Sequence, residues 1–381
     1  MKVLLISINS YYEPVGGSQY LRTLAYGYRS TEHVIVCKKS VANKQFYNSA
    51  LKELEKSFFS DLISRILITP CFLMFYLLKI IKLSKDSDII AFHSTRLGVI
   101  AAIISILYRN KKIIIHSDND ETNLIRQMPI KMSLKGVIIL IDNLLIPISE
   151  WLCNKVGDYY TFICEKDRRR FSGISEKNIK IIPVCLSLPQ ISNNIRNNDC
   201  EYSGPLLYTG SFDFYPNIDA LLLLLKIAKE LPEQNFIVAG RGLSTLQNKI
   251  EITKNVRLAS DVNSILMNRF FEESKAFICP VRYGSGMKIK IAEALSYGLP
   301  VIAHEMGIDG YEEISKEPFF ETMRGNNVSI MVNTIKQYLI RITCKRHQIR
   351  KLAYDAFVKY YTLQRCESIM KNILKSVGSN E

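Results

Sequence analysis

Short apolar runs rich in β-branched residues alternate with segments of helical spacing along most of the chain. In the first half, six such runs predict strands, namely Val3–Ser7, His33–Cys37, Ile89–Phe92, Lys112–His116, Thr161–Cys164 and Ile179–Val184. Strands that alternate with helices are typical of a parallel sheet with helical crossovers. The first half therefore predicts one Rossmann-like domain.

A second series of the same kind follows a polar, turn-rich stretch at Ser187–Gly204. Its predicted strands are Leu206–Thr209, Asn235–Ala239, Val256–Leu258, Ala276–Val281 and Pro300–His304, with helices such as Ile218–Glu230 between them. The basic segment Lys345–Val377 has helical spacing and no strand pattern. These patterns predict a second doubly wound sheet and a helical C-terminal tail.

The length of 381 residues agrees with two domains, because single cores rarely grow past about 250 to 300 residues. We expect an N-terminal Rossmann-like domain over 1–188, a C-terminal one over 205–355, and a crossover helix over 356–381. The expected fold is α/β, with two Rossmann-like domains facing across a cleft and the C-terminal helix packing across both.

The most informative segment is CPVRYGSGMKIKIAEALSYGLPVIAHE, at Cys279–Glu305. A strand is followed by a glycine turn at 284–286 and then by helical spacing over Met287–Tyr297. Glycines let the backbone approach a ligand closely, and a helix N-terminus offers unpaired N–H groups. This order of elements predicts a phosphate site at Gly284, Ser285 and Gly286.

Charged side chains in the predicted helix strengthen that interpretation. Lys288 and Lys290 bring positive charge, and Glu293 adds an acceptor suited to sugar hydroxyls. Two ordinary interpretations remain open. Glycine turns join strands to helices in many α/β proteins, and Glu293 could simply pair with Lys290 three positions earlier.

Similar glycine loops follow other predicted strands, where ligands bind in doubly wound sheets. Gly16 and Gly17 come after the first strand, with Ser18 as a candidate helix cap. Gly210 follows the first strand of the second series, with Asn217 as the candidate cap of the next helix, and Arg241 lies in the glycine loop after the next strand. A plain tight turn explains Gly16 and Gly17 equally well.

Composition and charge narrow the classes of function. A hydrophobic content of 48% excludes disorder, and nine scattered cysteines without a CxxC pair indicate a reducing compartment rather than a zinc site or a disulfide framework. The net charge is +14, with 27 Lys and Arg against 17 Asp and Glu in residues 1–200, or +10. A basic half can meet nucleic acid, anionic lipid or a phosphorylated substrate, and no nucleic-acid-binding motif is present.

An apolar segment at Arg65–Leu83 indicates a second kind of partner. Its charge-free part, Ile66–Leu78, has 13 residues and contains Pro70, which is too short for the roughly 20 residues of a membrane span. With Lys79, Lys82 and Lys85 beside it, the segment could lie at an anionic membrane surface. The alternative is a core helix of the first domain. We expect no transmembrane helix, and a cytoplasmic location, peripheral to the inner face of the plasma membrane.

The chain resembles the retaining glycosyltransferases of family 4, which have the GT-B fold. The resemblance covers most of the chain, and Cys279–Glu305 with the following MGIDG is its most specific part. The other segments that carry it are the Gly16-Gly17 loop, ISEWLCNKVGDYYTFICEKDRRRF, KIIPV, GSFDFYPNIDAL and NFIVAGRG.

The resemblance implies that a nucleotide-sugar donor, linked through UDP or GDP, binds mainly to the second domain. Its diphosphate would meet the backbone at 284–286 and the charge of Lys288, and Glu293 would hold the ribose. Donor contacts are also expected from Gly16, Gly17, Gly210, Arg241 and Arg282.

The first domain is expected to bind the acceptor. The resemblance places a histidine after an inner strand, and His116 matches it, with Asp118 close by. We assign His116 a catalytic role with Lys288 and Glu293, and acceptor contacts to His116 and Asp118. A buried strand-end histidine bonded to backbone is the alternative for His116. No metal or other cofactor is expected.

The sequence also departs from the family pattern. Many members carry two glutamates eight positions apart in the donor loop, whereas Ser285 holds the first of these positions here. Many also carry Arg and Lys after the first strand of the second domain, and residues 211–217 contain neither. We therefore expect Lys288, with Arg282, to neutralise the diphosphate.

The expected activity is transfer of a hexose to a glycan acceptor. The basic first half and the segment at Arg65–Leu83 favour a lipid-linked oligosaccharide acceptor at the anionic inner membrane, as in bacterial O-antigen or capsule biosynthesis. Two alternatives stay open: a GT-B sugar-nucleotide 2-epimerase, and a catalytically silent nucleotide-sugar-binding protein.

Overall fold

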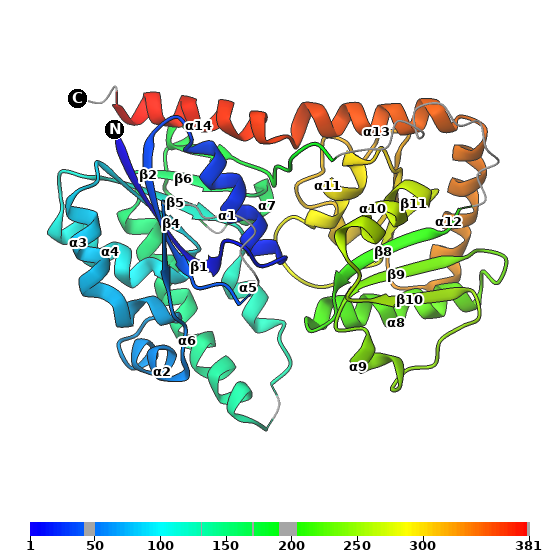
Figure 1. Cartoon of the computed structure of the whole chain (residues 1–381), viewed down its shortest axis with the longest axis horizontal. Coiled ribbons are helices and arrows are strands. Elements are labelled where there is room, and N and C mark those ends of the chain that lie inside the picture. The colour runs from blue at the N-terminus through cyan, green and yellow to red at the C-terminus, as the bar shows by residue number, and fades with distance from the viewer. Residues whose placement is uncertain (42–49, 131, 170, 190–203, 379–381) are drawn as a thin grey trace. The chain divides into compact units, whose positions relative to one another are not determined.

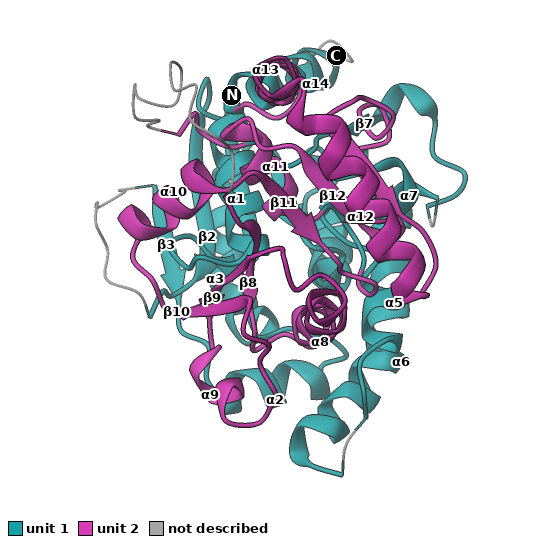
Figure 2. Ribbon diagram, turned by 90° about the vertical axis from the view of Figure 1, so that its right-hand side faces the viewer, with its two compact units in different colours: residues 1–185, 285–287, 363–381 teal, residues 186–284, 288–362 magenta. Residues whose placement is uncertain are grey.

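The computed structural model describes residues 1–41, 50–130, 132–169, 171–189 and 204–378, and two compact units make up the chain (Figures 1 and 2). The first unit contains Met1–Cys185, Ser285–Met287 and Leu363–Glu381, and the second contains Leu186–Gly284 and Lys288–Thr362. Each unit is built on one parallel sheet, which confirms the predicted pair of α/β domains. Most of the predicted linker, at 190–203, lies outside the described residues.

The sheet of the first unit has the strand order β3-β2-β1-β4-β5-β6-β7. Every neighbouring pair is parallel. Each of the six predicted runs overlaps a strand. The strands are β1 (Lys2–Ser10), β2 (Glu32–Lys38), β3 (Leu51–Leu54), β4 (Ile89–His93), β5 (Lys112–Ser117), β6 (Tyr159–Phe162) and β7 (Ile179–Ile181).

Helices cover both faces of this sheet, so the inner strands are apolar on both sides. On one face, Leu4 and Ile6 of β1 belong to the same buried core as Ile100 and Ile104 of α4. The helical elements of the unit are α1 (Gly16–Gly27), α2 (Phe58–Ile66), η1 (Phe72–Tyr76), α3 (Leu77–Lys85), η2 (Thr95–Leu97), α4 (Gly98–Leu107), α5 (Glu121–Arg126), α6 (Leu134–Val156), α7 (Glu165–Arg168), η3 (Glu176–Asn178) and α14 (Leu363–Gly378).

The sheet of the second unit has the order β10-β9-β8-β11-β12-β13 and is also parallel. Its strands are β8 (Leu206–Ser211), β9 (Phe236–Arg241), β10 (Val256–Ser260), β11 (Ala276–Cys279), β12 (Val301–His304) and β13 (Phe320–Met323). Its helical elements are α8 (Tyr215–Lys229), α9 (Ser244–Gln247), α10 (Ser264–Glu273), α11 (Ile289–Ser296), η5 (Glu305–Gly307), α12 (Val328–Thr343) and α13 (Arg346–Tyr360).

The C-terminal tail is helical, as its spacing predicts, but it forms two helices. The chain leaves helical geometry at Tyr361, and α14 begins at Leu363. Helix α13 is part of the second unit, where Arg350 donates to the carbonyl of Tyr297 at 3.0 Å. Helix α14 is part of the first unit and packs along α1, and the thiol of Cys366 lies 3.3 Å from the carbonyl of Thr23.

The apolar segment at Arg65–Leu83 is divided between a core and a surface. It contains the end of α2, a turn at Pro70, and then η1 and α3. Phe72 and Leu73 are buried in the core of the first unit, as the core-helix interpretation expects. Ile66 and Leu78, in contrast, are 71% and 82% exposed.

Helix α6 has an unusual distribution of side chains. Its buried positions include Asp142 and Glu150, whereas leucines and a tryptophan occupy its exposed side. Asp142 accepts from Arg65 of α2 at 2.9 Å and lies 3.8 Å from Arg96 of η2. These ion pairs fix α2 and η2 against α6, since buried carboxylates are stable only when they are paired.

By length and composition, α6 could also cross a membrane, with a mean hydropathy of 1.7 over its most apolar window. Core helices of soluble proteins can have the same length and hydropathy, and a third of the most apolar window of α6 is buried. Glu150 accepts hydrogen bonds from the backbone N–H groups of Glu121 and Thr122, at 3.0 and 3.4 Å. These contacts make α6 an integral part of the first unit.

We predict that Asp142→Ala destabilises the first unit by about 3 kcal/mol, because it leaves Arg65 and Arg96 with less compensation for their buried charge. Urea unfolding followed by the fluorescence of Trp151, the single tryptophan of the chain, measures this. Lys135→Ala, at an exposed position of the same helix, is the matched control and should change the unfolding free energy by less than about 0.5 kcal/mol. Equal effects of the two changes would contradict the role of the buried pair.

Candidate functional site

The glycine loop between β11 and α11 has the backbone geometry that the sequence predicts. Gly284 has a φ of 106° and Gly286 a φ of 68°, both in the left-handed region that disfavours other residues. Helix α11 begins at Ile289, two residues later than its spacing predicts, and Lys288 is its N-cap residue without a side-chain cap. Ser285–Met287 are grouped with the first unit, and the flanking residues with the second.

The loop leaves the sheet of the second unit beside the point where the strand order reverses. β8 and β11 are neighbours there, and ligands of doubly wound sheets bind outside the carboxyl ends of such strands. The side chain of Lys290 connects α11 to β8 and α8, because its Nζ lies 2.8 Å from Asn217 Oδ1 and 3.4 Å from the Tyr208 hydroxyl. A Cβ at Gly210 would lie 3.2 Å from the Lys290 Nζ.

Asn217 is not the helix cap that the sequence predicts. Helix α8 begins earlier, at Tyr215, with Phe214 in the N-cap position and Pro216 in its first turn. Proline is favoured there because its missing N–H has no helical partner to lose. The Asn217 amide instead donates to the Ser211 carbonyl at 2.8 Å and accepts from Lys290.

The pKa values of two titratable groups of α11 are shifted in the direction that favours the neutral form. Burial lowers the pKa of Lys290 to about 8, with the nearby charge of Lys288 acting in the same direction. Burial raises the pKa of Glu293 to about 7, and the charge of Lys290 opposes that shift. An anionic ligand near α11 would favour the protonated form of Lys290. The protonation of Lys290 and the binding of such a ligand are therefore linked.

The two arginines of the predicted donor site are engaged in ion pairs. Arg282 makes a bidentate pair with Asp219 at 2.7 and 3.0 Å, which raises the pKa of Arg282. Arg241 is exposed and lies 3.3 Å from Asp213. The carboxylates compensate much of the charge that these arginines could offer a diphosphate.

In the first unit, Gly16 and Gly17 form the first turn of α1 rather than a loop before it. The N-cap residue is Val15, and the Ser18 hydroxyl is buried without a hydrogen-bond partner among the described residues, so Ser18 is not the cap that the sequence predicts. A Cβ at Gly17 would lie 2.6 Å from the Asn9 side chain. Gly17 thus permits close approach between α1 and the end of β1.

His116 is fully buried at the end of β5, with both ring nitrogens engaged. Nε2 lies 2.8 Å from the Tyr28 hydroxyl and Nδ1 2.6 Å from Thr161 Oγ1. Burial, with a smaller effect of His93, lowers the pKa of His116 to about 3. This geometry fits a neutral histidine that positions its neighbours.

A second histidine, which the sequence analysis did not select, lies beside it. His93 ends β4, with its Nδ1 2.9 Å from Ser7 Oγ and its Nε2 3.4 Å from Asp118 Oδ2. The sequence contains a signal for His93, because the predicted strand ends at Phe92. Ligands of doubly wound sheets bind at the carboxyl ends of strands, and His93 is the next residue. Asp118 is the first residue after β5 and is only 6% exposed.

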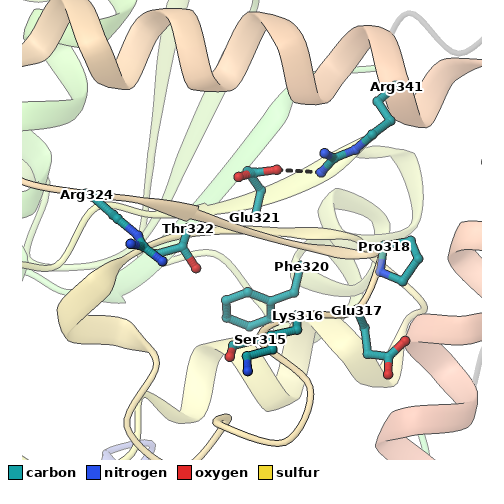
Figure 3. A pocket seen from close by; sticks show the side chains of 9 residues that line it. All are labelled: Ser315, Lys316, Glu317, Pro318, Phe320, Glu321, Thr322, Arg324 and Arg341. Atoms are coloured by element: carbon teal, nitrogen blue, oxygen red, sulfur yellow. Dashed lines mark hydrogen bonds and ion pairs between the residues drawn. The ribbon is translucent and has the colours of Figure 1, made fainter.

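Two hollows lie in the described parts of the units. One of about 450 Å³ follows the edge strand β13, where Glu321 pairs with Arg341 and Arg324 lies at the far side (Figure 3). The predicted donor residues do not line it. The other, of about 240 Å³, lies at the carboxyl ends of β1 and β2 and includes Ser10 and Lys38 in its wall.

Residues 204–337, within the second unit, match the family model described as glycosyl transferases group 1. An uncharacterized glycosyltransferase of Haemophilus influenzae is 27% identical over 104 residues. That stretch is 26% of this chain and 29% of the relative, so it spans less than a third of that protein.

Solved structures show that the chain has the GT-B fold. Anabaena HepE in complex with UDP superposes with a TM-score of 0.70 at 14% identity, over 99% of this chain and 100% of HepE. Sucrose-phosphate synthase of Thermosynechococcus elongatus gives 0.74 at 11% identity, over the whole of both chains. The lipopolysaccharide outer core galactosyltransferase WaaB gives 0.64 at 12% identity, over 99% of both.

The raised pKa of Glu293 predicts a pH-dependent stability. The folded state holds a proton on Glu293 between about pH 4.5 and 7 that the unfolded state releases, so stability falls as pH rises through this window. Between pH 4.5 and 7.5, we expect the free energy of unfolding of Glu293→Gln to rise by roughly 2 kcal/mol relative to that of the unchanged protein. Chemical denaturation at both pH values measures the difference, and Glu313→Gln, at an exposed carboxylate, should show none.

Proposed function

We propose that the protein is a retaining hexosyltransferase of family 4 type, which moves a sugar from a UDP- or GDP-linked donor to a glycan acceptor. The loop at 284–288 carries this proposal, because left-handed glycines, an uncapped helix start and Lys288 together offer N–H groups and charge to a diphosphate. The family match of residues 204–337 and the UDP bound by HepE support a nucleotide-sugar donor.

Transfer breaks the bond between the anomeric carbon and the phosphate and leaves negative charge on the diphosphate. In the proposed reaction the backbone N–H groups of 284–286 and the ammonium of Lys288 stabilise that charge. Glu293, one turn further along α11, accepts from the ribose hydroxyls. Because fixed donors supply the stabilisation, we propose that no metal ion takes part.

The acceptor side of the proposal rests on the first unit. The hollow at the ends of β1 and β2 contains Lys38 paired with Glu13 at 3.0 Å, and the buried hydroxyl of Ser10, which has no hydrogen-bond partner among the described residues. Such a mixture of donors and acceptors suits sugar hydroxyls. We propose that His116, with His93, keeps Asp118 and the neighbouring strand ends in place for acceptor binding.

The excess of 10 positive charges in residues 1–200 favours an anionic acceptor. We propose a lipid-linked oligosaccharide at the cytoplasmic face of the membrane, within bacterial surface polysaccharide biosynthesis such as O-antigen or capsule assembly.

Incubation with nucleotide-sugars alone tests the epimerase alternative, since an epimerase converts its substrate without an acceptor. The anomeric configuration of the transfer product, read by NMR, tests retention.

We predict that Lys288→Ala weakens UDP or GDP binding about 10- to 100-fold, because a charge-assisted contact to phosphate contributes roughly 1.5 to 3 kcal/mol. Glu293→Ala should weaken binding of the nucleoside diphosphate and lose donor turnover. Calorimetric titration measures both affinities, and Lys226→Ala, at an exposed lysine of α8, is the charge-matched control. If both site variants keep the affinity and turnover of the unchanged protein, the assignment of the donor site is wrong.

A further inference from the structure

Three exposed aromatic side chains lie beside the glycine loop of the second unit. Phe214 and Tyr215 stand at the start of α8, and Tyr283 directly precedes Gly284. All three are 39% to 43% exposed, and the ring centroids of Tyr215 and Tyr283 lie 6.1 Å apart. A single exposed ring needs no explanation, whereas rings that lie together beside a candidate site can supply an apolar face to a ligand.

The surrounding contacts hold the Tyr283 ring in place. The guanidinium carbon of Arg282 lies 5.6 Å from the centroid of that ring. Arg282 is itself fixed by its bidentate pair with Asp219 of α8 and by Asn326 Oδ1, which lies 3.4 Å from its Nη1. The ion pair thus keeps Arg282 beside the ring, and Tyr215 contacts the same ring from α8. A ring that is already positioned loses little conformational entropy when a ligand binds to it.

The two tyrosines each combine an apolar ring with a polar hydroxyl. Neither the Tyr215 nor the Tyr283 hydroxyl has a hydrogen-bond partner among the residues that the structure describes. A sugar ring has the matching chemistry, because its C–H bonds can lie against an aromatic face while its hydroxyl groups exchange hydrogen bonds with phenol groups. A phosphate group has no C–H bonds and gains nothing from such a face. The surface is therefore suited to a sugar ring.

The position of Tyr283 relative to the proposed diphosphate contacts favours one part of the donor. A Cβ at Gly284 would lie 3.9 Å from Lys288 Nζ, so this ammonium lies beside the residue that follows Tyr283. A nucleotide-sugar has its hexose on one side of the diphosphate and its ribose on the other. Glu293, the proposed ribose ligand, follows Lys288 along α11, whereas Tyr283 precedes it. This order favours the hexose for contact with Tyr283.

We propose that the ring of Tyr283, supported by Tyr215 and Arg282, is the surface against which the hexose of the donor packs. The C–H face of the hexose lies on the Tyr283 ring, and its hydroxyl groups bond to the phenol groups. Tyr283 is then a specificity-determining residue for the transferred sugar. The inference rests on the proposed function for the nature of the donor, and it adds the residue that contacts the hexose itself.

Calorimetric titration of the full chain with UDP, GDP, UDP-glucose, UDP-galactose and GDP-mannose tests the proposal. For the nucleotide-sugar that binds most tightly, we expect Tyr283→Ala to weaken binding about 5- to 20-fold, because the variant lacks the stacking surface. The affinity for the matching nucleoside diphosphate should change less than about twofold. Phe58→Ala, at an exposed aromatic residue of α2 in the first unit, is the matched control and should leave both affinities unchanged.

Tyr283→Phe separates the ring from its hydroxyl. This variant keeps the apolar face, so its affinity for the nucleotide-sugar should stay within about threefold of that of the unchanged protein. Circular dichroism checks that each variant is folded. In Tyr283→Ala, an equal loss for the nucleoside diphosphate and its sugar derivative would assign the ring to the nucleoside and overturn the proposal, as would undiminished binding of the nucleotide-sugar. If the unchanged protein binds none of these compounds, the proposed function fails first, and this inference with it.

Discussion

The constraint on which both units depend is the burial of a parallel sheet on both of its faces. Strand interiors such as residues 3–6 are fully buried, so polar side chains can enter only where strands end. In the first unit the register aligns Ser7 with His93, His93 with His116, and His116 with Thr161. One row of polar groups thus crosses four strands at their carboxyl edge, where their hydrogen bonds to one another replace those to water.

The corresponding edge of the second unit has a different composition, in agreement with the different roles that we propose for the two units. Gly210 is in register with Gly240, and a Cβ at Gly240 would lie 1.8 Å from the Gly210 carbonyl oxygen. Glycines there expose backbone rather than side chains, which suits a diphosphate that is recognised by N–H groups. The polar row of the first unit suits the positioning of hydroxyls and of an acceptor.

The sequence predicted the strands of both sheets except β3 and β13, which are four-residue edge strands with polar residues in their sequences, LKEL and FETM. Edge strands are half solvated, so the apolar signal of an inner strand is absent. The glycine loop at 284–286 was predictable because left-handed geometry needs glycine. The pairing of Arg282 with Asp219 was not, because it joins residues 63 positions apart that no local pattern relates.

The buried acids of α6 determine which side of this helix is exposed. Asp142 and Glu150 must stay inside, because Arg65 and the N–H groups of the α5 start depend on them. The inner face of α6 holds these groups, and its leucines and its tryptophan lie on the outer face. Rotation of α6 about its axis would expose the acids and leave Arg65 buried without its partner. The ion pairs therefore fix which face of α6 is exposed, and the leucines and the tryptophan lie on that face.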